Sequence, residues 1–177
     1  MNIFIVNGAP GSGKTTFEHM VQELLGKHKV FILSTIDPIK KMAEQIGWKG
    51  SKTPKDRKFL SDLKDLVTEY NDGPMNYIKD ELRFIHNIFK SYDVPTDQAV
   101  VFIDIREPHE IARAVNELGA KTILIKRPIV EEISNHADAN VESYQYDYVI
   151  KNYEDKTYLE QLAEIFIKEN ITRKDLV

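Results

Sequence analysis

The sequence predicts an α/β fold built on a parallel sheet, because short apolar runs alternate with helix-like segments along the chain. The apolar run at residues 99–103 is continuous rather than alternating, which is typical of a strand buried on both faces of a sheet. The length of 177 residues suits one domain, 1–177, with room for a small insertion.

Five segments have the length and composition of strands. They are residues 2–6, 30–33, 99–103, 122–125 and 146–150. The first strand is followed by Gly8, the third ends at Asp104, and the fourth ends at Lys126-Arg127. Polar or glycine residues therefore follow these apolar runs directly.

Six segments carry helical spacing or helix-start signals. They are residues 14–27, a helix opening at Asp37-Pro38, residues 56–70 and 74–92, a helix from Glu107-Pro108 to Gly119, and residues 156–168. The expected apolar face of the first helix is Phe17, Met20, Val21, Leu24 and Leu25. The expected apolar face of the second helix is Ile39, Met42, Ala43 and Ile46.

Composition excludes several classes of protein. The chain has no cysteine, which rules out disulfides and thiolate metal sites and fits a reducing compartment. The net charge is −4 and the lysines are spread along the chain, which argues against a broad nucleic-acid surface. No apolar run approaches the roughly 20 residues of a membrane span, and nothing resembles a signal peptide. We therefore expect a cytoplasmic protein with neither a nucleic-acid nor a membrane partner.

The loop after the first strand matches the pattern G-x-x-x-x-G-K-[ST]. Its expected phosphate-binding residues are Gly8, Ala9, Pro10, Gly11, Ser12, Gly13, Lys14, Thr15 and Thr16. Glycines let the backbone curl so that successive N–H groups face one concavity, and a helix N-terminus adds its dipole. Lys14 can reach the β- and γ-phosphates, and the Thr15 hydroxyl can bind Mg²⁺. The loop therefore predicts a site for a nucleoside triphosphate, ATP with Mg²⁺.

Charged residues follow two later strands, where ligands of open α/β sheets gather. Asp104 closes the third strand and can hold Mg²⁺, usually through water. Arg106 lies two residues further on, and its planar fork suits a phosphate. Arg127 follows the fourth strand and is a candidate to neutralise charge on a transferring phosphoryl group.

Five stretches, taken in order, resemble a known family. They are residues 8–16 (GAPGSGKTT), 37–40, 56–60, 104–110, and 134–138 followed by 146–152. Together they span nearly the whole chain and resemble the P-loop nucleoside monophosphate kinases, most closely the deoxynucleoside monophosphate kinases often encoded by bacteriophages. The resemblance implies a three-layer P-loop NTPase fold with a five-stranded parallel sheet. It also implies a helical acceptor-binding insertion over about 37–95 and a short lid over about 128–145.

The same resemblance implies roles for individual residues. Arg57 and Arg106 would hold an acceptor (deoxy)nucleoside monophosphate, with Asp37 and Lys40 near that pocket. Lys14, Thr15 and Arg127 would serve the triphosphate and the transferring group. Asn152 would lie near the base of ATP. A homodimer is compatible with the resemblance, since dimers occur among related kinases.

One departure from the family concerns the lid. No lysine or arginine lies between Pro128 and Gln145, whereas the lid of adenylate kinases contributes several arginines. Asn135 and His136 are the neutral donors that this segment offers. Two other readings stay open: a P-loop kinase of another small acceptor, such as a phosphomevalonate-like compound or a nucleoside, and a non-catalytic nucleotide-binding module.

Overall fold

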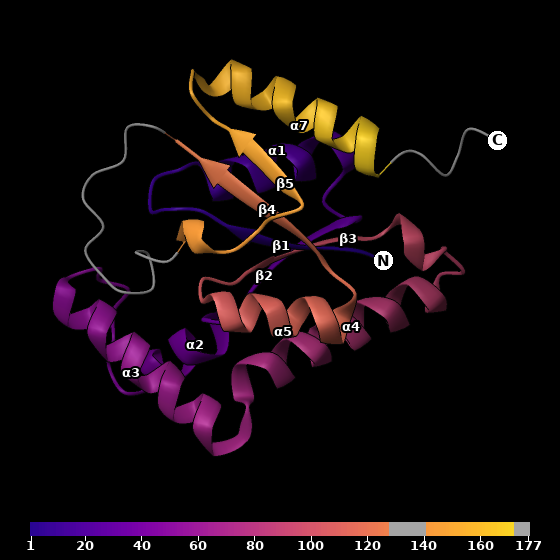
Figure 1. Ribbon diagram of the computed structural model, residues 1–177. Coiled ribbons are helices and arrows are strands. Elements are labelled where there is room, and N and C mark those ends of the chain that lie inside the picture. Colours follow the sequence, from indigo (N-terminus) through magenta and orange to yellow (C-terminus); the bar gives the residue numbers. More distant parts are fainter. Residues whose placement is uncertain (128–140, 172–177) are drawn as a thin grey trace. The chain divides into compact units, whose positions relative to one another are not determined.

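The computed structural model describes residues 1–127 and 141–171 (Figure 1). The chain forms two compact units, one made of Met1–Ile32 and Pro95–Val177 and the other of Leu33–Val94. The second unit covers most of the segment expected as an insertion. Among the described residues, no helix is both long and apolar enough to cross a membrane.

A five-stranded sheet organises the fold, as the sequence predicts. Its strands are β1 (Asn2–Asn7), β2 (Val30–Ser34), β3 (Val100–Asp104), β4 (Lys121–Lys126) and β5 (Tyr148–Lys151). They lie in the order β2-β3-β1-β4-β5. β1 pairs in parallel with β3, opposing Val6 to Asp104, and with β4, opposing Asn7 to Leu124; β4 pairs in parallel with β5. The carboxyl ends of β3 and β4 therefore flank the carboxyl end of β1.

Helices cover both faces of the sheet in the first unit. They are α1 (Lys14–Leu25), α5 (Pro108–Leu118) and α7 (Lys156–Asn170), with short 3₁₀ turns at Thr96–Gln98 and Val141–Ser143. α1 and α7 contact each other on one face, and α5 packs on the other face against β1 and β4 (Figure 1). The expected three-layer α/β architecture is thus confirmed.

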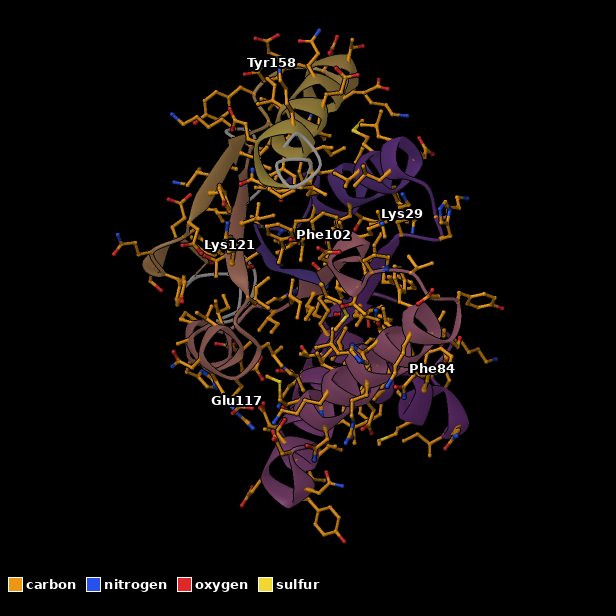
Figure 2. The ribbon with its side chains drawn as sticks, turned by 90° about the vertical axis from the view of Figure 1, so that its right-hand side faces the viewer. Lys29, Phe84, Phe102, Glu117, Lys121 and Tyr158 are labelled. Carbon is orange, nitrogen blue, oxygen red and sulfur yellow. The ribbon has the colours of Figure 1, made fainter. Side chains whose placement is uncertain are left out.

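Phenylalanines form the centre of the core between the sheet and the helices α1 and α7. The ring centroids of Phe4 and Phe166 lie 5.0 Å apart, and those of Phe17 and Phe166 lie 5.5 Å apart, both in edge-to-face geometry. Phe102 lies 6.2 Å from Phe17 and is fully buried, among the interior side chains of Figure 2. Aromatic pairs of this geometry stabilise a core beyond the area that they bury.

The buried side of α1 differs from the expected one. Leu24 is 43% exposed, whereas Glu18 is completely buried together with Phe17, Met20 and Val21. The stripe that faces the sheet is therefore rotated toward Glu18, because burial follows the position of the helix on the sheet and not the polarity of each residue.

β5 begins two residues later than expected. The carboxylate of Asp147 accepts hydrogen bonds from the backbone N–H of Thr122 (2.7 Å) and from its hydroxyl (2.8 Å). This side chain takes the place of a strand partner beside β4, so regular pairing starts only at Tyr148.

The second unit consists of α2 (Asp37–Gln45), α3 (Pro54–Asn71) and α4 (Gly73–Ser91). Thr53 and Asp56 form a capping box at the start of α3, which satisfies N–H groups of its first turn. The expected apolar face of α2 is correct at Ile39 and Ala43 and wrong at Met42 (41% exposed) and Ile46 (71% exposed). Ile46 lies beyond the last helical turn, and Ile39 and Ala43, one turn apart, form a narrow buried stripe.

Candidate functional site

The glycine-rich loop connects the end of β1 to the start of α1. Gly8, Gly11 and Gly13 have φ values of 152°, 78° and 101°, in the region that favours glycine. A Cβ atom on Gly8 would lie 2.5 Å from the carbonyl oxygen of Ile125, which belongs to β4. The loop therefore follows its path only because a glycine stands at Gly8, as the sequence motif predicts.

Lys14 directs its ammonium group into this loop. Its Nζ donates hydrogen bonds to the carbonyl oxygens of Gly8 (2.5 Å) and Ala9 (3.3 Å). The positive charge of Lys14 thus lies against the backbone of the loop, where it can attract an anion. α1 begins at Lys14 with Gly13 as its N-cap, and its first turn, which is fully described, contains no acidic side chain. The positive end of the helix is therefore not neutralised by its own residues.

Thr15 and Thr16 lie in the first turn of α1, and both are exposed. Ser12 is buried, and its hydroxyl oxygen has no hydrogen-bond partner in the described part of the chain. Hydroxyl groups of this loop could therefore bind Mg²⁺, which prefers oxygen ligands and accompanies phosphate groups.

Asn152 contacts the loop through its side chain. It is 4% exposed, and its side-chain amide donates to the carbonyl oxygen of Ser12 (2.8 Å). A Cβ atom on Gly13 would lie 2.6 Å from the same amide nitrogen. The structure thus gives Asn152 a part in holding the loop, and its place near the base of ATP stays a prediction.

Two strand ends carry the charged residues expected beside the loop. Asp104 is the last residue of β3 and lies opposite Val6. Arg106 follows two residues later and is exposed, as is Arg127 directly after β4. Since β3 and β4 flank β1, the topology brings all three residues to the edge of the sheet where the loop begins.

Glu18 is a buried acidic residue close to the loop in the chain, and the sequence reasoning did not select it. It lies one turn beyond Lys14 on α1, and neither of its carboxyl oxygens has a hydrogen-bond partner among the residues described. Burial first, and the charge of Asp104 second, raise the pKa of Glu18 to about 8, against the opposing effect of the Lys14 charge. In the sequence, the only sign of this residue is that an acid stands between Phe17 and Met20, two members of the expected apolar face.

Asn7 forms a second polar cluster that the sequence does not reveal. It is buried, and its amide nitrogen donates to the carbonyl oxygen of Arg106 (3.1 Å) and to the hydroxyl of Tyr146 (2.8 Å). Its amide oxygen accepts from the N–H of Gly8 (2.8 Å). One side chain thus ties the start of the loop to the backbone that carries Arg106.

The expected acceptor residues Asp37, Lys40 and Arg57 lie in the second unit. Lys40 Nζ lies 3.5 Å from Oδ1 of Asp37 in α2. Arg57, in α3, donates through Nε to the carbonyl oxygen of Lys52 (3.2 Å) and is exposed. Their approach to Arg106 stays a prediction. Residues 128–140 of the expected lid, with Asn135 and His136, lie outside the described residues.

A metal at this site would depend on more than protein ligands. No group of three or more His, Cys, Asp or Glu side chains able to hold a metal occurs within residues 1–127 and 141–171. Mg²⁺ in phosphoryl-transfer sites keeps several waters and binds through one or two side chains plus phosphate oxygens. Thr15 and Asp104 fit this donor set.

No protein-family model matches the chain, and no curated protein matches its sequence. Solved structures do resemble it. A protein from Chloroflexus aurantiacus assigned as a kinase has a TM-score of 0.51 at 13% identity, over 96% of this chain and 97% of that one. A dephospho-CoA kinase from Campylobacter jejuni has a TM-score of 0.49 at 19% identity, over 96% and 97% of the two chains. A shikimate kinase from Aquifex aeolicus has a TM-score of 0.48 at 13% identity, over 97% and 99%.

The likeness to the Chloroflexus aurantiacus protein concerns the fold. The chain has an α/β fold with a five-stranded sheet and helices on both faces, and this fold resembles that of the Chloroflexus aurantiacus protein. The identities are too low to carry an activity or a substrate across.

Proposed function

We propose that the protein transfers the γ-phosphoryl group of ATP to a (deoxy)nucleoside monophosphate and releases ADP and the diphosphate. The observation that carries the transfer is the position of the Lys14 loop at the end of β1, between the ends of β3 and β4 that bear Asp104, Arg106 and Arg127. The acceptor class rests on the order of the motifs at residues 37–40, 56–60 and 104–110.

In this proposal an oxygen of the monophosphate attacks the γ-phosphorus, a new P–O bond forms, and the bond to the oxygen that bridges to the β-phosphate breaks. The acceptor oxygen is already anionic, so no strong general base is required. Lys14, Arg106 and Arg127 stabilise the charge that develops on the phosphoryl oxygens. Mg²⁺, held by Thr15 and Asp104, would neutralise charge on the β- and γ-phosphates when bound.

The proposal is tested by incubating the purified protein with Mg²⁺-ATP and each common ribo- and deoxynucleoside monophosphate in turn. Formation of ADP and a diphosphate is measured. We expect rapid, selective diphosphate formation with one or a few monophosphates. The K14M variant should lose this activity by at least about 10²-fold with its circular dichroism unchanged, because it lacks the charge held in the loop.

Two outcomes would overturn parts of the proposal. Near-normal turnover by K14M would exclude the loop as the phosphate site. ATP binding without product from any monophosphate would exclude the nucleotide acceptor and would direct the acceptor scan to nucleosides and phosphomevalonate-like compounds, or leave a binding role.

A further inference from the structure

The starting point is the burial of Glu18. This side chain is 0% exposed, and both of its carboxyl oxygens lack a hydrogen-bond partner within the described residues. Burying an unpartnered carboxyl group costs free energy in either protonation state. An apolar side chain would fill the same space on α1 at a lower cost. We therefore expect the buried carboxyl group of Glu18 to have a function that offsets this cost in free energy.

Glu18 lies on the same face of α1 as two residues of the proposed nucleotide site. It follows Thr15 by three residues and Lys14 by four, and such spacings place side chains on the same face of a helix. The charges of Asp104 and Lys14 both act on its carboxyl group, so that group lies near the end of β3 as well as near the loop. Two carboxyl groups, one on α1 and one at the end of β3, thus lie near the first turn of α1, which contains Thr15.

The chemistry of Mg²⁺ supplies a reason for a second carboxyl group there. A Mg²⁺ ion bound through phosphates retains several water molecules, which need hydrogen-bond acceptors on the protein. Carboxyl groups that hold such waters orient the metal, although they do not touch it. A further carboxyl group near Thr15 and Asp104 would supply these waters with another acceptor on the protein.

We propose that Glu18 accepts hydrogen bonds from the water molecules around the nucleotide-bound Mg²⁺ and thereby makes tight nucleotide binding dependent on the metal. This inference rests on the proposed function only in its requirement for ATP binding, and it is independent of the acceptor. Glu18 acts here as a positioning residue for the metal.

The test measures the affinity for the non-hydrolysable ATP analogue AMP-PNP by calorimetry, once with excess Mg²⁺ and once with EDTA. The dissociation constant in EDTA divided by the dissociation constant with Mg²⁺ measures how strongly the binding of the metal and the binding of the nucleotide are coupled. We expect Glu18→Gln to lower this ratio about tenfold, the usual effect of losing a residue that supports a metal from its second layer of contacts. Glu23→Gln is the matched control, since Glu23 lies exposed on the same helix, and it should leave the ratio unchanged.

A second readout follows the metal itself. The electron paramagnetic resonance signal of free Mn²⁺, titrated with protein and AMP-PNP, should show weaker Mn²⁺ binding by Glu18→Gln than by the wild type or by Glu23→Gln. Circular dichroism checks that each variant is folded, and Glu18→Met replaces Glu18→Gln if the latter is not.

The outcomes separate this inference from the proposed function. One outcome is that the wild type binds AMP-PNP more tightly with Mg²⁺ than with EDTA, while the ratio of dissociation constants for Glu18→Gln lies within about twofold of the wild-type ratio. That outcome would overturn the role of Glu18 and leave the proposed nucleotide site unaffected. Equal binding by the wild type with Mg²⁺ and with EDTA would also overturn it. A wild type that binds AMP-PNP in neither condition would overturn the proposed function and this inference with it.

Discussion

The amide nitrogen of Asn7 lies 2.8 Å from the hydroxyl oxygen of Tyr146, although the two residues are 139 positions apart in the chain. Asn7 ends β1, and Tyr146 precedes β5, so the bond links the start of the glycine-rich loop to the segment that returns after β4. The Tyr146 hydroxyl in turn donates to the carbonyl oxygen of Val141 (2.8 Å). Burial raises the pKa of Tyr146 to about 12, so this hydroxyl stays protonated and able to donate well above neutral pH.

The first prediction concerns this tyrosine. Tyr146→Phe removes the hydroxyl and leaves the amide of Asn7 and the carbonyl of Val141 without one partner each, so the free energy of unfolding should fall by about 1–3 kcal/mol. Tyr144→Phe is the control, because the Tyr144 ring packs against Tyr146 (5.2 Å between centroids) and its hydroxyl takes no part in the bonds that join Asn7, Tyr146 and Val141. Urea unfolding of both variants measures the difference. Equal stabilities would show that the bond contributes nothing.

The second prediction concerns pH and Glu18. The pKa of this carboxyl is raised from 4.5 to about 8 in the fold, by burial first and by the charge of Asp104 second, against the charge of Lys14. Between these two values the folded state holds a proton that the unfolded state has released, so stability is greatest below pH 4.5 as far as this group is concerned and declines up to about pH 8. The loss amounts to a few kcal/mol at most.

Glu18→Gln removes this titration. In the metal-free protein it should raise the melting temperature at pH 8 and flatten the fall in melting temperature between pH 5 and pH 8, whereas Glu23→Gln should retain the slope of the wild type. Melting curves recorded in EDTA at a series of pH values provide the measurement. Parallel curves for the wild type and Glu18→Gln would refute the prediction. A more stable variant with a poorer metal site is the pattern expected where a functional group is kept at the expense of stability.

These residues also show where sequence reasoning succeeds and where it ends. The positions of the loop, Asp104 and Arg127 at strand ends were predictable because each depends on a local pattern, a motif or a residue directly after an apolar strand. Glu18 was not, since periodicity assigns a charged residue to the solvent side of a helix, whereas its burial depends on how α1 lies on the sheet. The pairing of Asn7 with Tyr146 was equally hidden, because it requires the spatial order of β1, β4 and β5.

The third prediction separates the glycines of the loop. Gly8→Ala places a Cβ atom 2.5 Å from the carbonyl oxygen of Ile125, a backbone atom that cannot move aside cheaply, whereas a Cβ atom on Gly11 meets nothing within 4 Å. Both glycines have positive φ, so both variants carry some backbone strain. Gly8→Ala should therefore lower the melting temperature more than Gly11→Ala and weaken AMP-PNP binding more strongly. Equal losses in the two variants would indicate that strain alone, and not the contact with β4, governs the loop.

The fourth prediction concerns the two arginines at the strand ends. Arg106→Ala and Arg127→Ala should each lower kcat about 10²- to 10³-fold, because each removes a charge-stabilising donor from the transferring phosphoryl group. Arg113→Ala is the control: Arg113 lies on α5 with Nε 2.5 Å from Oε1 of Glu117, and its loss should change kcat by less than about twofold, since exposed ion pairs contribute little. Steady-state kinetics with the accepted monophosphate measure kcat and KM for each. A raised KM for the monophosphate with unchanged kcat in Arg106→Ala would assign Arg106 to acceptor binding alone. An interaction that is equally strong in the ground state and the transition state alters KM without altering the chemical step.

Kinetic constants for both variants that match those of Arg113→Ala would show that neither arginine belongs to the site.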